Sequence, residues 1–372
     1  MRPTWVEVDT GSIAKNIERV RATIPGKTQI MAVVKADGYG HGAVPVAIAA
    51  LKSGAAFLGV ALVEEGIALR RAGIVAPILF MEALFPWQAP DLVRYGLTAT
   101  VASYESADVL SESAALLGRK AKVHIKVDTG MGRLGLPPEA IPGLVRHVSG
   151  LPRLEIEGIF THLACAESDP SMTCRQLELF HDIVDGLAAE GYEIPIKHVA
   201  NSAAALRVPE AAMDMVRIGG AMYGISPLGI SPLGQGWQRA LSFKTRVSYM
   251  KPVKAGATVS YGATYVAPGP QLIATLPVGY ADGYSRLLSG RGEVLIGGVR
   301  CPVAGRVCMD QIMVVLPPDS DVRVGDEAVL IGEQGNEVIC AEDIARIMGT
   351  IGYEVVCAIS KRVPRVYVSS QP

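Results

Sequence analysis

Short apolar runs alternate with amphipathic segments between residues 30 and 220 of the chain. The runs that have the length and composition of buried strands are 30–34, 57–61, 77–81, 97–102, 123–127, 156–162, 196–200 and 215–218. The segments between them, such as 106–117 and 175–189, carry apolar residues at helical spacing. Eight strand–helix units in about 200 residues predict a TIM-type (β/α)8 barrel rather than an open sheet.

A further helix is predicted ahead of the first run. Ile13, Ile17 and Val20 recur at the i, i+4 and i+7 spacing that places side chains on one helix face. The candidate N-cap residues of this helix are Asp9, Thr10 and Ser12.

The pattern changes after about residue 240, where strands no longer alternate with helices. Alternating runs at 245–249, 293–296 and 299–303 predict half-buried strands. Gly297-Gly298 joins the last two runs and predicts a tight hairpin turn. One helix is predicted at 341–348. The expected fold class is therefore α/β, with an N-terminal barrel followed by a mostly β C-terminal domain.

A chain of 372 residues is long enough for two domains. We expect residues 11–235 to form the barrel and residues 236–372 to form the β-rich domain, with the boundary in the Gly- and Pro-rich stretch 224–236. Residues 1–10 contain an alternating run, Trp5 to Val8, which we expect to pair as a strand with the second domain.

Composition narrows the class of protein. With 49% hydrophobic and 19% charged residues, the chain is globular, and a formal net charge of −1 gives no electrostatic footprint for nucleic acid or a membrane surface. No signal peptide or membrane-spanning run is recognisable. The six cysteines form no C-x-x-C pair and no histidines lie at zinc spacing, so we expect free thiols, no metal and a cytoplasmic location.

The most informative motif follows the first apolar run. Lys35 lies at the end of this run, and Gly38, Gly40 and Gly42 follow it, with Tyr39 among them. A lysine that is desolvated at the mouth of a buried strand is a plausible nucleophile toward a carbonyl group. The glycines permit a tight turn and Tyr39 can donate to an anion, so the motif predicts a covalently held carbonyl cofactor with a phosphate. Taken alone, the lysine fits an ordinary strand-end residue better, and only the surrounding motif favours the nucleophile.

Polar residues also end the later runs, at the edge where barrel enzymes place their active sites. The residues in these positions are Lys126, Asp128, His162, Asn201, Ser202, Arg217, Gly219 and Gly220. Asn201-Ser202 and Gly219-Gly220 offer backbone N–H groups and a hydroxyl to a phosphate. Arg217 alone could also form a surface ion pair.

The run A-V-V-K-A-D-G-Y-G-H-G, residues 32–42, closely resembles the cofactor-lysine motif of alanine racemases. The blocks at 126–135 and 306–311 are also similar to that family, and the resemblance extends over essentially the whole chain. It implies pyridoxal 5'-phosphate bound through Lys35, interconversion of L- and D-alanine for cell-wall peptidoglycan, and a homodimer with shared active sites.

The resemblance also implies roles for individual residues. The implied cofactor-binding residues are Lys35, Tyr39, His162, Ser202, Arg217, Gly219, Gly220 and Tyr353. Arg217 would face the pyridine nitrogen; because arginine does not give up its proton, the ring would stay unprotonated and be a weaker electron sink. Lys35 and Tyr261 would be the two opposed bases that racemisation needs. Arg133 and Met309 would contact the substrate carboxylate.

Several alternatives remain open from the sequence. Lys126 matches a lysine that carries a CO2 adduct in some family members, and an unmodified lysine is equally consistent. Taken alone, Tyr261 fits a half-buried strand tyrosine, whereas Cys308 fits a packing thiol and His41 a structural residue.

Other functions would keep the same fold. A serine or broad-specificity racemase is the first alternative, and a non-catalytic pyridoxal-phosphate-binding protein is a less favoured one. Tyr353 and Met309 favour a small pocket and hence alanine, and Arg217 disfavours the related decarboxylases.

Overall fold

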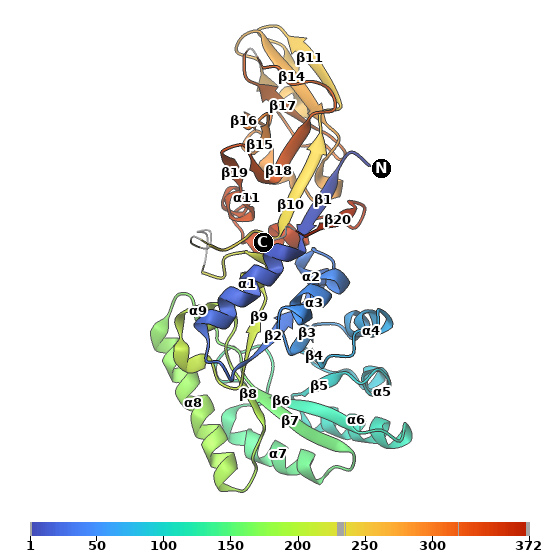
Figure 1. Cartoon of the computed structure of the whole chain (residues 1–372), viewed down its shortest axis with the longest axis vertical. Helices are drawn as coiled ribbons and strands as arrows, with labels where there is room; N and C mark the ends of the chain where they lie inside the picture. Colours follow the sequence, from blue (N-terminus) through green and yellow to red (C-terminus); the bar gives the residue numbers. More distant parts are fainter. Residues whose placement is uncertain (1, 229–233, 235, 319, 370–372) are drawn as a thin grey trace. The chain divides into compact units, whose positions relative to one another are not determined.

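The structure is a computed structural model that describes residues 2–228, 234, 236–318 and 320–369. It divides into two compact units (Figure 1). The barrel unit comprises Ala14–Gly38 and Ala43–Met222, and the β unit comprises Met1–Ile13, Tyr39–Gly42 and Tyr223–Pro372. The predicted boundary segment 224–236 lies partly outside the described residues.

Eight parallel strands form the centre of the barrel unit. They are β2 (Gln29–Val33), β3 (Phe57–Val60), β4 (Ile78–Phe80), β5 (Thr98–Val101), β6 (Ala121–Lys126), β7 (Leu154–Phe160), β8 (Ile196–His198) and β9 (Met215–Ile218). Their order in the sheet is β8-β7-β6-β5-β4-β3-β2-β9, and each overlaps one predicted run. The N–H groups of Asp214 and Arg217 donate to the carbonyls of Lys197 and Ala200, which links β9 to β8. The predicted barrel is confirmed.

Helices follow the strands and surround them (Figure 1). They are α2 (Lys35–Tyr39), α3 (Ala43–Lys52), α4 (Val63–Arg71), α5 (Ala89–Arg94), α6 (Tyr104–Leu116), α7 (Ile141–Gly150), α8 (Pro170–Ala189), α9 (Ser202–Arg207) and α10 (Gly220–Tyr223). Inside the strands, a buried cluster around Met31, Leu79 and Met215 fills the barrel with apolar side chains. This apolar cluster is a packed core, so a ligand can bind only at the rim of the barrel.

The predicted first helix is α1 (Thr10–Thr23). Of the three candidate caps, Asp9 fills the role, since its carboxylate accepts from the Gly11 N–H at 2.9 Å and the Ser12 hydroxyl at 2.7 Å. No described helix is long and apolar enough to cross a membrane.

The β unit contains two main sheets. The larger sheet has the order β16-β15-β18-β10-β1-β20, with β19 on β18; the smaller has the order β11-β14-β17, and β12 pairs with β13. The strands are β1 (Trp5–Asp9), β10 (Leu241–Arg246), β11 (Tyr249–Val253), β12 (Thr258–Val259), β13 (Tyr265–Val266), β14 (Gln271–Leu276), β15 (Glu293–Ile296), β16 (Val299–Pro302), β17 (Ile312–Leu316), β18 (Glu327–Gln334), β19 (Glu337–Ile339) and β20 (Arg365–Val368). β1 pairs antiparallel with β10 and parallel with β20. Two helices, α11 (Ala341–Met348) and α12 (Gly352–Cys357), complete the unit.

One strand prediction in this unit is wrong. The alternating run 245–249 is not a single strand, because β10 ends at Arg246 and β11 begins at Tyr249. The Val247 N–H donates to Asp326 at 2.9 Å, and the next N–H, of Ser248, donates to Thr275 at 2.9 Å. The backbone thus leaves the larger sheet and joins the smaller one within two residues, a change of partner that local alternation does not reveal.

The predicted hairpin and helix of the β unit are confirmed. Gly297 and Gly298 have φ values of 62° and 79°, as a type I′ turn between β15 and β16 requires. The predicted helix at 341–348 is α11. The short helix α12, which carries Tyr353, was not predicted.

Candidate active site

Lys35 lies at the rim of the barrel unit, just beyond β2. The Val34 N–H donates to the Gly59 carbonyl at 2.9 Å, so the strand ladder continues up to the residue before Lys35. The Lys35 side chain is half-buried rather than fully desolvated, and no described residue accepts a hydrogen bond from its amine. The amine is therefore available to a ligand.

The turn after Lys35 is held in an unusual backbone conformation. Ala36, Asp37 and Gly38 have φ values of 52°, 53° and 61°, in the left-handed region that non-glycine residues rarely adopt. The turn is held by hydrogen bonds from the Ala36 N–H to Glu65 at 2.6 Å and from the Ala43 N–H to Asp37 at 2.9 Å. Gly38, Gly40 and Gly42 also have positive φ values, of 61°, 78° and 95°, as the sequence predicts for a tight turn, and Ala36 and Asp37 share the left-handed conformation without being glycines. Backbone strain of this kind is concentrated at functional sites.

Arg217, on β9, is buried inside the rim, which makes the surface ion-pair interpretation wrong. Its Nη1 donates to His198 Nδ1 and to the His198 carbonyl, each at 3.0 Å. Its Nη2 has two N–H groups, which are shared among three acceptors: the carbonyls of Thr161 and Val199 at 2.9 and 3.0 Å and His162 Nδ1 at 3.1 Å. No described residue accepts from Nε, so this one N–H is left for an acceptor outside the protein. Burial, followed by the charge of Arg133, lowers the pKa of Arg217 to about 9, and the group stays protonated at neutral pH.

His162 follows β7 and contacts Arg217. Burial, then the charges of Arg217, Arg133, Lys126 and Lys35, lower the pKa of His162 to about 2. The imidazole is therefore neutral, and because its Nδ1 accepts from Arg217, its proton lies on Nε2. The charged groups that lower the pKa of His162 are all predicted site residues. The structure therefore brings these residues together around the His162 imidazole.

A small polar cradle forms where α9 and α10 begin. The Ser202 hydroxyl accepts from the Gly219 N–H at 3.0 Å, while Asn201 caps α9 by accepting from the Ala204 N–H at 3.0 Å. The Gly219 N–H and the Asn201 side chain are therefore used within the fold. No described residue accepts from the Gly220 N–H, so this donor and the Ser202 hydroxyl remain for an anion.

Lys126 is a buried cation at the end of β6. Burial, then the charge of Arg217, lower the pKa of Lys126 to about 7. Its amine donates to the Val127 carbonyl at 2.9 Å and lies 5.1 Å from the centre of the Phe160 ring. A substantial fraction of this lysine is therefore neutral near pH 7.

The loop after β6 carries Arg133 to the same cluster. The Asp128 carboxylate accepts from the N–H groups of Gly130 and Gly132 at 3.0 and 3.1 Å and so shapes this loop. The Arg133 side chain is exposed, and no described residue pairs with it, so its guanidinium is free to bind a carboxylate.

The remaining predicted site residues belong to the β unit. Tyr39 and Tyr353 lie together there, with ring centres 5.8 Å apart, and Tyr39 also packs on Tyr223 at 4.9 Å. Burial raises the pKa of the Tyr39 hydroxyl, which therefore stays a hydrogen-bond donor. His41 Nδ1 donates to the Tyr39 carbonyl at 2.8 Å and its ring lies 4.5 Å from Tyr223, which supports a structural role for His41.

Tyr261 lies in a strained turn and not in a strand. It begins the short 3-10 helix Tyr261–Ala263 and is 72% exposed, so the half-buried strand interpretation is wrong. Ser260 has φ 70°, and its hydroxyl donates to the Arg306 carbonyl at 2.7 Å. The Cys308 thiol is 3.6 Å from the same hydroxyl. The Tyr261 turn is thus fastened to the loop that carries Met309.

Met309 presents its side chain to solvent and is 53% exposed. Its carbonyl accepts from the Ala281 N–H at 3.1 Å, and no described residue accepts from its own N–H. The backbone N–H is therefore open to a ligand.

Comparison with known proteins shows to which family the chain belongs. The models described as "Alanine racemase, N-terminal domain" and "Alanine racemase, C-terminal domain" match residues 8–227 and 240–367. The chain belongs to the alanine racemase family. Its members are isomerases, and this protein is therefore an isomerase of the barrel-fold racemase class.

Individual relatives are similar to this chain along nearly its full length. The alanine racemase of Symbiobacterium thermophilum is 50% identical, covering 99% of this chain and 97% of the relative. The alanine racemase of Halothermothrix orenii is 47% identical, covering 98% and 97%. The solved alanine racemase of Clostridium difficile 630 superposes with a TM-score of 0.94 at 40% identity, covering 99% of this chain and 96% of that one. That of Bacillus anthracis, solved with bound L-Ala-P, has a TM-score of 0.92 at 41% identity, covering 99% and 95%.

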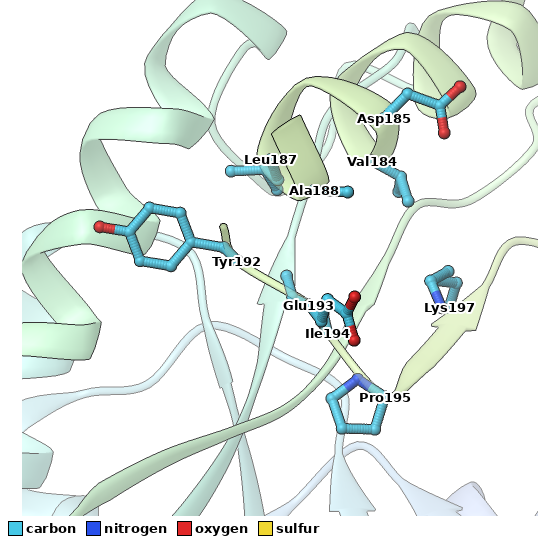
Figure 2. A pocket seen from close by; sticks show the side chains of 9 residues that line it. All are labelled: Val184, Asp185, Leu187, Ala188, Tyr192, Glu193, Ile194, Pro195 and Lys197. Carbon is cyan, nitrogen blue, oxygen red and sulfur yellow. The ribbon is translucent and has the colours of Figure 1, made fainter. Parts of the chain in front are cut away.

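A separate surface groove of roughly 500 Å³ lies at the opposite end of the barrel strands (Figure 2). It is bordered by the end of α8, residues 192–195 and Lys197 near the start of β8. None of the predicted site residues lines it, and Lys197 is paired with Asp214 at 3.3 Å. Enzymes of this fold carry their chemistry at the carboxyl ends of the strands, so this groove is not the active site.

The sequence interpretation missed three residues behind Arg217. His124, Glu157 and His198 are buried and form hydrogen bonds with one another. Each lies within a run that was interpreted only as a buried strand. Ionisable residues inside such runs are the signal that could have identified them. No cluster of His, Cys, Asp or Glu among the described residues is arranged to hold a metal ion, and the six cysteines are free.

Proposed function

We propose that this protein interconverts L-alanine and D-alanine with pyridoxal 5'-phosphate as its cofactor, and that it supplies D-alanine for peptidoglycan from the cytoplasm. The observation that carries the proposal is the Arg217 guanidinium, whose Nη1 and Nη2 donors are occupied while Nε has no described acceptor. Such a donor fits an unprotonated ring nitrogen, because a protonated one could not accept from it.

The other residues fit the remaining parts of the cofactor. Lys35 has an unpaired amine for covalent attachment, and Ser202 and Gly220 offer an O–H and an N–H to the phosphate, with Gly219 holding the Ser202 hydroxyl in place. Tyr39, which stays protonated, and Tyr353 would donate to the same phosphate. When bound, pyridoxal phosphate supplies an aldehyde that links covalently to amines and a ring that withdraws electrons from the substrate Cα.

Racemisation needs proton removal on one face of Cα and delivery on the other, so two opposed bases are required. Lys35 is proposed to exchange the proton on the face of the D-isomer, and Tyr261 on the face of the L-isomer. Arg133 and the Met309 N–H would hold the substrate carboxylate. His162, neutral and with its proton on Nε2, would connect the second base to Arg217.

Lys126 is proposed to carry a CO2 adduct. Only a neutral amine reacts with CO2, and the lowered pKa of Lys126 makes that form available near pH 7. The adduct would replace one cation by an anion and would orient the exposed guanidinium of Arg133.

The proposed function is tested by incubating the purified protein with L-alanine and pyridoxal phosphate and following optical rotation. The rotation should fall to zero as the mixture becomes racemic. Run in parallel, L-serine measures how strictly the site selects alanine. A rotation that stays constant with both substrates would contradict the proposal.

Arg217→Glu is expected to lower kcat by at least about 10²-fold, since a preorganised donor is lost. A carboxylate there can share a proton with the ring nitrogen, so the ring becomes a stronger electron sink and long-wavelength absorbance should build up when alanine is added. Arg217→Lys, which keeps the charge but cannot supply five hydrogen bonds, is the matched variant and should lower kcat without new absorbance. Unchanged turnover and spectrum in Arg217→Glu would refute the role.

We further propose that the working enzyme is a homodimer whose two equivalent sites each combine residues of both subunits. The support is that Lys35 belongs to the barrel unit and Tyr261 to the β unit. Mixing inactive Lys35→Ala chains with inactive Tyr261→Ala chains should then restore about a quarter of the wild-type activity, because half of the dimers are mixed and each has one intact site. If the chains exchange, as shown by differential tagging, but activity stays at zero, each site is built from a single chain.

A further inference from the structure

A line of three buried hydrogen bonds extends from Arg217 through the interior of the barrel. Arg217 Nη1 is 3.0 Å from His198 Nδ1, His198 Nε2 is 2.8 Å from His124 Nδ1, and His124 Nε2 is 3.3 Å from a carboxylate oxygen of Glu157. Both histidines are fully buried and Glu157 is 8% exposed. We call these four residues the Glu157 relay.

The carboxylate at the end of the relay fixes the direction of every hydrogen bond in it. Burial alone would raise the pKa of Glu157, but hydrogen bonds from His124 and Lys122 outweigh burial and hold the pKa at about 2. The carboxylate is therefore ionised and can only accept, so His124 donates through Nε2 and accepts through Nδ1. His198 must then donate through Nε2 and accept from Arg217 through Nδ1.

Burial, the largest contribution for both histidines, lowers their pKa, so both are neutral and carry a single ring proton. A neutral histidine has one donor and one acceptor nitrogen. If either ring carried its proton on Nδ1, an N–H would face another N–H at one of the contacts. Because Arg217 can only donate and the Glu157 carboxylate can only accept, both ends of the relay require the same tautomer, and Glu157 supports the acceptor that His198 offers to Arg217.

Two backbone features of β7 make room for the relay. Along β6 and β7, Val123 pairs with Ile156 but His124 pairs with Gly158, so Glu157 is the extra residue of a β-bulge. Bulges re-aim a side chain relative to a regular strand. At the next position, a Cβ on Gly158 would lie 2.6 Å from the His124 ring. The bulge therefore alters the direction of the Glu157 side chain, and the glycine leaves room for the His124 ring that Glu157 contacts.

Two further contacts hold the Glu157 carboxylate at the outer end of the relay. Lys122 Nζ lies 2.5 Å from the other oxygen of Glu157, and its side chain is half-exposed. The Thr98 hydroxyl donates to the same oxygen as His124, at 3.2 Å. These contacts hold the carboxylate in place, and the Lys122 hydrogen bond also helps to keep it ionised.

We propose that Glu157, acting through His124 and His198, is a positioning residue that sets the orientation of the Arg217 guanidinium and so aims its Nε at the cofactor ring. The inference rests on the proposed function for the identity of that ring. It adds a residue remote from the substrate to the set that determines the turnover rate.

The first test is the tautomer of the two histidines. In the holoenzyme labelled with 15N-histidine, the His124 and His198 resonances, assigned with His124→Gln and His198→Gln variants, should both show a neutral ring protonated on Nε2. A ring protonated on Nδ1 at either residue would overturn the relay. This readout does not depend on turnover, so it decides the relay even if the protein fails to racemise alanine.

The second test is kinetic and spectroscopic. Glu157→Ala should lower kcat about 10- to 100-fold, the range typical of residues that orient a functional group, with little change in KM and with a shifted visible band of the bound cofactor. Glu157→Gln keeps an acceptor and should recover part of the loss. Glu155→Ala, which removes an exposed carboxylate from the same strand, should leave kcat and the band near wild type.

Wild-type kcat and absorbance in a folded Glu157→Ala holoenzyme would overturn the positioning role. If that variant does not fold, Gly158→Ala provides the same test, because its Cβ displaces the His124 ring while Glu157 is kept. Gly158→Ala should show the same loss in kcat and the same band shift, and a wild-type result there would overturn the proposal.

Discussion

Lys35→Ala is expected to lose racemisation by more than about 10⁴-fold and to lose the covalently held cofactor, because one amine serves both as the attachment point and as one of the two bases. The structure leaves this amine without a described acceptor at the rim of the barrel and fixes the next residues in a left-handed turn. Wild-type protein should be yellow, whereas Lys35→Ala should lose its colour on dialysis.

Peptide mapping gives this prediction its control. Borohydride reduction of the wild-type protein should fix the cofactor to one peptide, and that peptide should contain Lys35. Lys126, the other lysine of the cluster, is buried and bonded to the Val127 carbonyl, and should not be labelled. Lys52→Ala, at an exposed position of α3, should behave as wild type. A label on a peptide that lacks Lys35 would contradict the assignment.

The sequence predicts the barrel well because several of its strands, including β3, β4, β5 and β9, are buried along their whole length and read as mostly apolar runs. The same reasoning fails between Arg246 and Tyr249, where the alternation continues but the backbone changes sheets. Which sheet a strand joins depends on hydrogen bonds to residues such as Asp326 and Thr275. Those partners are distant in sequence and leave no local pattern.

The residues of the candidate site also divide into those that the sequence predicts and those that it does not. Lys35, His162 and Arg217 could be found because they end strands, and the barrel fold places strand ends at the active site. The left-handed conformation of the turn could not be predicted, since Ala36 disfavours it and the hydrogen bonds of Ala36 and Asp37 to their surroundings hold it. The position of Glu157 depends on a bulge between β6 and β7, and a bulge is a property of two paired strands.

Tyr261→Phe should abolish α-proton exchange from L-alanine while leaving much of the exchange from D-alanine. The substitution removes only the hydroxyl and keeps the ring in an exposed turn that is held by Ser260 and Arg306. Loss of a positioned acid–base group costs about 10²- to 10⁴-fold in rate. The measurement is deuterium incorporation from D2O into each isomer, followed by NMR at early times, before racemisation mixes the two pools.

The asymmetry between the isomers is what distinguishes a base from a residue that merely shapes the site. A tyrosine that only packed against the substrate would slow exchange from both isomers alike, because both share the same binding site. Tyr249→Phe, at another exposed tyrosine of the β unit, is the matched control and should change neither rate. Equal residual exchange from L- and D-alanine in Tyr261→Phe would show that Tyr261 is not the base for the L-isomer. The second proton would then have to come from another group, of which the neutral His162, with its Nε2 proton, is the first to test.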